Sequence, residues 1–223
     1  MIRPTAHKRR DAGFTMIEVM VATAIFSVLM GLLSTMVVQM IRTGSGTRAR
    51  LANTEQLRVG IDALTKGLRT AVRPEQINSA CSSNCSSAFL AATGQSVSLY
   101  VNFGEAAGPR LTTYRVEADP AHAGTGRLVE QQHSPASPGG SPSLTCTTAC
   151  TTRVLVYGIT WPVPATTPIF AFGDSTGAAL TTSAADLAKV ATVAVTIPLN
   201  GGRDYPATSV TSTVFLPNSV MGG

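Results

Sequence analysis

GFTMIEVMVATAIFSVLMGLLSTMVVQMI occupies residues 13–41 and contains one charged side chain, Glu18. From Phe14 to Ile41 the run exceeds the ~20 apolar residues that a helix needs to cross a bilayer core. An ordinary secretory signal has a shorter apolar region, of about 7–15 residues, and a small-x-small cleavage site after it. Here Arg42 follows directly. We therefore expect a membrane-spanning helix over residues 14–41.

Basic residues are concentrated before this helix. Arg3, Lys8, Arg9 and Arg10 stand against Asp11 alone, which gives a local charge of +3 out of the formal +5 of the chain. Basic flanks stay on the cytoplasmic side, so the rest of the chain should lie outside the inner membrane. The later basic residues are dispersed, which gives weak support for nucleic-acid binding and leaves direct binding open. They are Arg110, Arg115, Arg127, Arg153, Lys189 and Arg203.

Glu18 is the unusual residue of the apolar run. An acidic side chain at the centre of a membrane helix costs about 2.5–3.5 kcal/mol, and less near a helix N-terminus, where the dipole favours it. Taken alone, Glu18 is best explained as an interfacial carboxylate at the headgroups.

The residues around Glu18 favour a second explanation. The sequence Gly13-Phe14-Thr15-Met16-Ile17-Glu18-Val19, preceded by a basic leader, resembles the prepilin processing motif of type IV pilins and pseudopilins. Met16 stands where Leu is commoner. The resemblance implies that a prepilin peptidase cuts between Gly13 and Phe14, and that Phe14 is then N-methylated. It covers only about the first 30 residues.

The resemblance also implies a role for Glu18 in filament assembly. Cleavage creates a free amine at Phe14, and Glu18 lies one helical turn further along. In a filament this amine can pair with the Glu18 carboxylate of a neighbouring subunit. Within an apolar bundle such a pair has few competitors, so it can set the axial register.

The helix should continue beyond the membrane. Leu57, Ile61, Leu64, Leu68 and Val72 recur at helical spacing, with charged residues on other faces. The pattern predicts an amphipathic helix over residues 42–73 that Pro74 ends. Two helices joined near residues 43–47, beside Gly44 and Gly46, are the alternative.

The region 74–223 is predicted to be a β-rich globular region. Alternating apolar residues and Gly/Pro/Asn clusters mark its strands, and residues 133–143 form a loop by composition. The fold class is therefore α+β: a long N-terminal helix packed on an antiparallel sheet, as in pilins. The expected strands are 96–103, 110–117, 126–131, 153–161, 188–199 and 208–216.

The four cysteines form two Cys-x-x-x-Cys pairs, Cys81/Cys85 and Cys146/Cys150. An exported location favours disulfides, with local closure of each loop as the first choice and cross-linking of the two loops as the second. A four-thiolate zinc site is the alternative. We expect no metal and no other cofactor.

No catalytic set is apparent. His122 and His133 lie in Pro/Gly-rich stretches and are expected to be solvated, and the loop between Asp174 and Asp186 offers too few oxygen ligands for calcium. Trp161 is expected to cap an edge of the core. The sequence therefore predicts a structural protein rather than an enzyme.

The predicted organisation has four parts: a leader at 1–13 that is removed, a membrane and filament-core helix at 14–41, an amphipathic helix at 42–73 and an extracytoplasmic region at 74–223. The predicted function is a minor pilin or pseudopilin of a pilus, secretion or DNA-uptake filament, held first in the inner membrane and then at the cell surface. Segments such as VLVYGITW (154–161) and VTSTVFLPN (210–218) are similar to J- or W-type subunits. The expected partners are prepilin peptidase, other pilin subunits, the assembly platform and lipid. A filament-displayed binding module is the alternative, and a membrane-tethered enzyme is a third.

Overall fold

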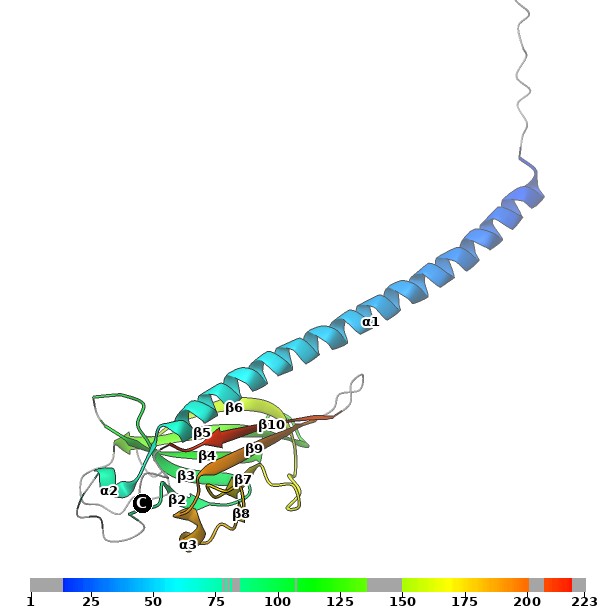
Figure 1. Cartoon of the computed structure of the whole chain (residues 1–223). Coiled ribbons are helices and arrows are strands. Elements are labelled where there is room, and N and C mark those ends of the chain that lie inside the picture. Colours follow the sequence, from blue (N-terminus) through cyan, green and yellow to red (C-terminus); the bar gives the residue numbers. More distant parts are fainter. Residues whose placement is uncertain are drawn as a thin grey trace, which may run out of the picture. The chain divides into compact units, whose positions relative to one another are not determined.

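A computed structural model of the chain (Figure 1) describes residues 14–77, 79, 81, 85–106, 108–135, 150–200 and 207–217, with the side chains of 42, 45–53, 134 and 135 left aside. One long helix is followed by a large antiparallel sheet, which confirms the predicted α+β class. The helices are α1 (Met16–Arg69), α2 (Pro74–Ile77) and α3 (Ala184–Leu187). The strands are β1 (Ala71–Val72), β2 (Phe89–Ala92), β3 (Ser96–Val101), β4 (Arg110–Ala118), β5 (Thr125–Pro135), β6 (Thr151–Thr160), β7 (Phe170–Gly173), β8 (Ala179–Leu180), β9 (Thr192–Leu199) and β10 (Thr208–Phe215).

The helix α1 is a single element of 54 residues. Its first turn is closed by Thr15, whose carbonyl and hydroxyl oxygens both accept from the Glu18 N–H, at 3.1 and 3.4 Å. Lys66 and Arg69 lie in the last turn, where the helix dipole stabilises positive charge. Residues 43–47 are helical, so the alternative of two helices joined there is wrong.

The end of α1 differs from the prediction. The helix ends at Arg69, and Ala71 and Val72 pair instead with Val101 and Tyr100 of β3. The Asn102 N–H also donates to the Thr70 carbonyl at 3.0 Å. Hydrogen bonds to a neighbouring strand therefore replace the last predicted turn, and Pro74 begins α2 rather than ending α1.

The chain divides into two compact units, 1–50 and 51–223. We call the second unit the head. It therefore includes the C-terminal part of α1 in addition to the region 74–223 expected from the sequence.

Among the described residues of the head, the sheet has ten strands. Its order is β1-β3-β4-β5-β6-β9-β7-β8, with β2 paired to β3 and β10 paired to β9. The six predicted strands correspond to β3, β4, β5, β6, β9 and β10, although residues 188–191 lie outside β9 and β5 extends to Pro135. The sequence did not predict β1, β2, β7 or β8, because two to four residues are too few to show an alternation.

Part of α1 packs across one face of this sheet. A Cβ on Gly60 would lie 2.5 Å from Val156 of β6, and a Cβ on Gly67 would lie 1.9 Å from the Tyr114 hydroxyl of β4. Leu57, Leu64 and Leu68 of the same helix are buried in the core. Two glycines seven residues apart therefore let the helix backbone approach the strands closely while the leucines fill the interior.

Candidate functional site

The N-terminal junction is the first candidate site. Gly13 lies outside the described residues, so cleavage after it stays a prediction. Phe14 is 82% exposed. Thr15 and Glu18 have the spacing of a helix capping box, which was not predicted from the sequence. The Glu18 side chain makes no hydrogen bond or ion pair with any residue that the structure describes, and its carboxylate is therefore available to a group from outside the chain.

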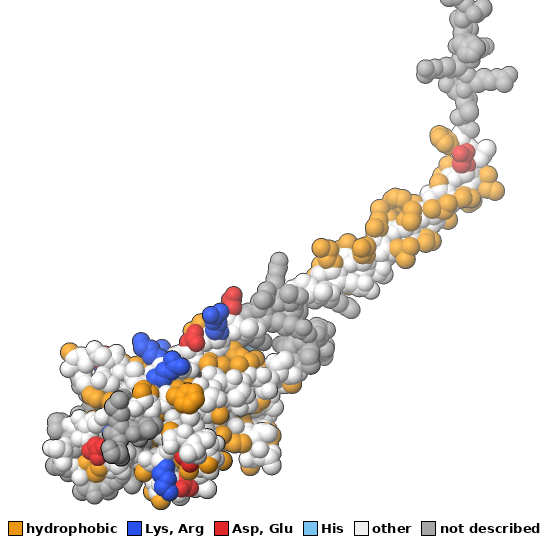
Figure 2. Space-filling view, in the orientation of Figure 1, with side chains coloured by type: hydrophobic (Ala, Val, Ile, Leu, Met, Phe, Trp, Pro, Cys, Tyr) orange, Lys and Arg blue, Asp and Glu red, His pale blue; other side chains and the backbone are white. Residues whose placement is uncertain are grey.

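The surface beyond Glu18 is apolar and uncovered. Met16–Ile41 has a mean hydropathy of 2.2, with none of it buried inside the chain, and is long and apolar enough to cross a membrane. Figure 2 shows the hydrophobic side chains exposed along this part of α1. Phe14, Glu18, Ala22 and Phe26, each four residues from the next, line one shallow depression. Such a surface requires lipid or other apolar helices to cover it.

The described cysteines form disulfide bonds. Cys81 and Cys85 are bonded to each other, with Cα atoms 5.8 Å apart, which confirms local closure of the first loop and excludes the four-thiolate zinc site. Cys150 is also disulfide-bonded. Cys146 lies outside the described residues, so its pairing with Cys150 stays a prediction.

We expect the Cys81–Cys85 bond to contribute stability. Replacing both residues by Ser should lower the free energy of unfolding by about 2 kcal/mol, because the bond closes a short loop in the unfolded chain. Thermal unfolding of the full chain in detergent measures this, and wild type treated with reductant, in which the Cys150 disulfide is broken as well, is the comparison. An unchanged midpoint in both samples would show that the bond does not constrain the unfolded state.

The two histidines of the head differ from each other. His122 is exposed, as predicted, and its Nδ1 lies 3.0 Å from the Asp119 carboxylate. His133 was predicted to be solvated, which is wrong: it lies in β5 and is half-buried, and its Nε2 has no hydrogen-bond partner. Burial lowers the pKa of His133. No nucleophile is recorded as a hydrogen-bond partner of either ring in the described structure.

Asp174 and Asp186 accept hydrogen bonds from residues close to them in the sequence. One Asp174 oxygen accepts hydrogen bonds from the Thr176 N–H and hydroxyl and from the Ala178 N–H, at 2.7–2.9 Å. Asp186 accepts from the Thr181 N–H and hydroxyl. Within the described residues, no group of three or more His, Cys, Asp or Glu side chains could hold a metal ion. These carboxylates therefore shape turns.

The arginines of the strands face carboxylates. Glu117 accepts from both Arg115 and Arg127, at 2.9 and 2.6 Å. Burial raises the pKa of Glu117, but the hydrogen bonds from these two arginines outweigh burial and hold it below its ordinary value. Arg110 pairs with Glu105, and Arg153 pairs with the fully buried Glu130. A polyanion would therefore have to break ion pairs to bind these strands.

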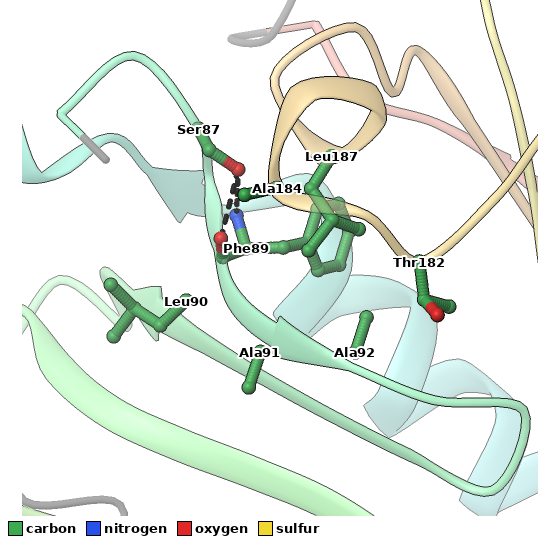
Figure 3. Close-up of a pocket in the computed structure, with 8 residues that line it drawn as sticks. All are labelled: Ser87, Phe89, Leu90, Ala91, Ala92, Thr182, Ala184 and Leu187. Atoms are coloured by element: carbon green, nitrogen blue, oxygen red, sulfur yellow. Dashed lines mark hydrogen bonds between the residues drawn. The ribbon is translucent and has the colours of Figure 1, made fainter. Parts of the chain in front are cut away.

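A small pocket lies between β2 and α3 (Figure 3). It encloses about 210 Å³, and the Ser87 hydroxyl beside it is bonded to the Phe89 N–H and carbonyl. Its lining carries no ionisable side chain, and we assign it no catalytic role. The lining residues are Ser87, Phe89, Leu90, Ala91, Ala92, Thr182, Ala184 and Leu187.

A row of polar side chains beneath α1 was not predicted from the sequence. Tyr114, Glu130 and Arg153 are register partners on β4, β5 and β6. Burial raises the pKa of Tyr114, and its hydroxyl has no hydrogen-bond partner among the described residues. Alternation along each strand could have placed these residues on one face, but only the register brings them together.

Trp161 is partly buried and packs against the core, as predicted.

Comparison with known proteins identifies the N-terminal segment. Residues 8–34 match the family model for the prokaryotic N-terminal methylation motif. No curated protein and no solved structure matches the chain. The motif implies processing by a peptidase and assembly with other pilins. It includes Phe14 and Glu18 and overlaps the exposed apolar part of α1. Because this motif overlaps an apolar helix that begins at Met16, the chain is a type IV pilin-like protein.

Proposed function

We propose that the chain is a minor pilin or pseudopilin. It is inserted into the inner membrane as a precursor, cut between Gly13 and Phe14, and assembled through its N-terminal helix into a type IV pilus or a related secretion or DNA-uptake filament. The observation that carries the proposal is the methylation motif at residues 8–34, which overlaps a helical segment with an uncovered apolar surface, Met16–Ile41.

The exposed apolar surface of α1 must be covered both before and after assembly. Before assembly, lipid covers the apolar side chains of Met16–Ile41, with the basic leader in the cytoplasm and the head outside. After assembly, the helices of neighbouring subunits cover them. The Glu18 carboxylate, which has no described partner within its own chain, then pairs with the Phe14 amine of a neighbour. Lipid and neighbouring helices supply adhesion, and the ion pair supplies register.

The minor role rests on the likeness of the β6 and β10 segments to J- or W-type subunits. Such a subunit serves in assembly, priming or placement near a tip. Display of a nucleic-acid-binding surface is less well supported, because Arg110, Arg115, Arg127 and Arg153 are already paired with carboxylates.

The proposal predicts the mature N-terminus. Mass spectrometry of protein from native membranes should show Phe14 as the first residue, carrying one N-methyl group. Gly13→Leu should leave the precursor uncut, because the peptidase recognises the Gly-Phe junction.

Gly31→Leu is the matched control. It makes the same change within the apolar helix, at a glycine with no neighbouring atom within 4 Å, and should be processed normally. A mature chain that begins at Met1 or within the head would contradict the proposed function.

A further inference from the structure

A charged cleft lies where α1 crosses the sheet of the head. It encloses about 490 Å³. Ala63 and Lys66 of α1 form one wall, and the other walls come from β5, β6 and the segment after β3. These residues are Phe103, Glu105, Glu130, Gln132, Thr151 and Arg153.

Both carboxylates of the cleft are already paired. Glu130 is fully buried, and its Oε2 accepts from Arg153 Nε at 2.6 Å and from Nη2 at 2.5 Å. Gln132 donates its amide N–H to the other Glu130 oxygen. Glu105 accepts from Arg110 at 2.5 Å. The charges of these four ionised groups therefore cancel in pairs.

Lys66 supplies the remaining charge. Its side chain lines the cleft but is exposed to solvent, and its ammonium makes no ion pair with any residue that the structure describes. The dipole of α1 stabilises the positive charge of Lys66, because Lys66 lies in the last turn of the helix. The three N–H donors of the ammonium nevertheless have no acceptor from the described chain. The cleft therefore presents one positive charge beside the apolar surfaces of Ala63 and Phe103.

We infer that this cleft receives an acidic side chain of a neighbouring pilin subunit, whose carboxylate pairs with Lys66. The inference rests on the proposed function. One unneutralised cation matches one carboxylate, whereas a nucleic acid or another polyanion requires several. The methylene groups of an Asp or Glu side chain fit against Ala63 and Phe103.

The ion pair with Lys66 can form in a filament because its carboxylate belongs to a neighbouring subunit. A single ion pair of this kind contributes little in water, so a free carboxylate in solution would rarely occupy the cleft. A carboxylate carried by an adjoining subunit is held close by the rest of the assembly, which raises its effective concentration.

Carbodiimide cross-linking tests the inference. The reagent activates a carboxylate as an O-acylisourea, the Lys66 amine attacks its carbonyl carbon, and an amide bond forms as a urea leaves. The chain has three lysines, Lys8, Lys66 and Lys189, and processing removes the first. Sheared filaments treated with the reagent should yield, on peptide mapping, an amide between Lys66 and an Asp or Glu peptide of another subunit. Unassembled protein in detergent should not.

Lys189 is the internal control, because its exposed side chain already lies 3.9 Å from Asp186. Lys66→Arg should abolish the cross-link but keep the chain in filaments, since the charge is retained. Lys66→Glu should lower recovery in filaments by about threefold, from one lost ion pair and a new repulsion. Lys189→Glu should leave recovery unchanged.

The outcomes separate the two proposals. If the wild-type chain is present in filaments but Lys66 is linked to no other subunit, or only to Glu105 or Glu130 of its own chain, this inference is overturned and the proposed function stands. If the chain is processed at another position and is absent from filaments, the proposed function and this inference both fail.

Discussion

Glu18→Ala should leave the amount of protein in the membrane unchanged and reduce its recovery in sheared filaments at least tenfold. Insertion is preserved because the change removes a costly charge from an apolar helix. Incorporation fails because the Phe14 amine would enter an apolar bundle without its partner. An uncompensated buried charge costs about 3–5 kcal/mol, and each 1.4 kcal/mol is a factor of ten in an equilibrium. Immunoblots of the two fractions measure the ratio.

The chain offers a matched control for this change. Glu55 is also exposed on α1, and Glu55→Ala removes the same charge without touching the N-terminal pair, so it should be recovered normally. A subunit placed first, at the tip, has none ahead of it and would tolerate the loss of Glu18. Normal recovery and filament length with Glu18→Ala would show that Glu18 is only an interfacial carboxylate.

Gly67→Ala should destabilise the head strongly. The added Cβ would lie 1.9 Å from the Tyr114 hydroxyl and 2.9 Å from its ring carbon Cζ, so the helix or the ring must move. Overpacking typically costs about 1–3 kcal/mol, and a clash this close should reach the top of that range. The unfolding midpoint should fall by roughly 6–12 °C for a domain of this size, as measured by circular dichroism of the full chain.

Two controls separate this clash from helix propensity. Gly44→Ala makes the same substitution in α1 at a position with no atom within 4 Å, and should stabilise the helix by up to about 1 kcal/mol. Tyr114→Phe removes a buried hydroxyl without a described partner, so it should be neutral or stabilising, and should partly rescue Gly67→Ala. An unchanged midpoint for Gly67→Ala would refute the close packing of α1 on β4.

The elements that could be predicted are those with long periodic patterns. The apolar run from Phe14, the leucine stripe from Leu57 and the alternation in β3 and β9 each extend over several repeats, so burial of one face is visible in the sequence. The end of α1 could not be predicted. Helix and strand compete equally for Ala71 and Val72 in a local reading, and only the partner β3, about thirty residues further on, decides between them.

Some residues of the candidate sites could be predicted from the sequence, and others could not. Gly13, Phe14 and Glu18 are found from a local motif, because a peptidase reads a continuous segment. Lys66, Glu130 and Arg153 come from three elements, and their cleft exists only after the register of β5 and β6 is fixed. Gly60 and Gly67 resemble weak positions in a helix when read alone. The structure explains why these positions are glycine, because Val156 and Tyr114 occupy the space that a side chain would need.

Leu57, Leu64 and Leu68 belong to the helix that begins in the apolar segment, yet they are buried in the core of the head. A protease that cut the chain after Arg69 would therefore take these side chains away from the sheet and expose its apolar face to water. We expect such a fragment to unfold and be degraded rather than to accumulate in the medium. A cut after Arg69 is therefore expected to destroy the subunit, because the fragment it leaves lacks the helical part of the head.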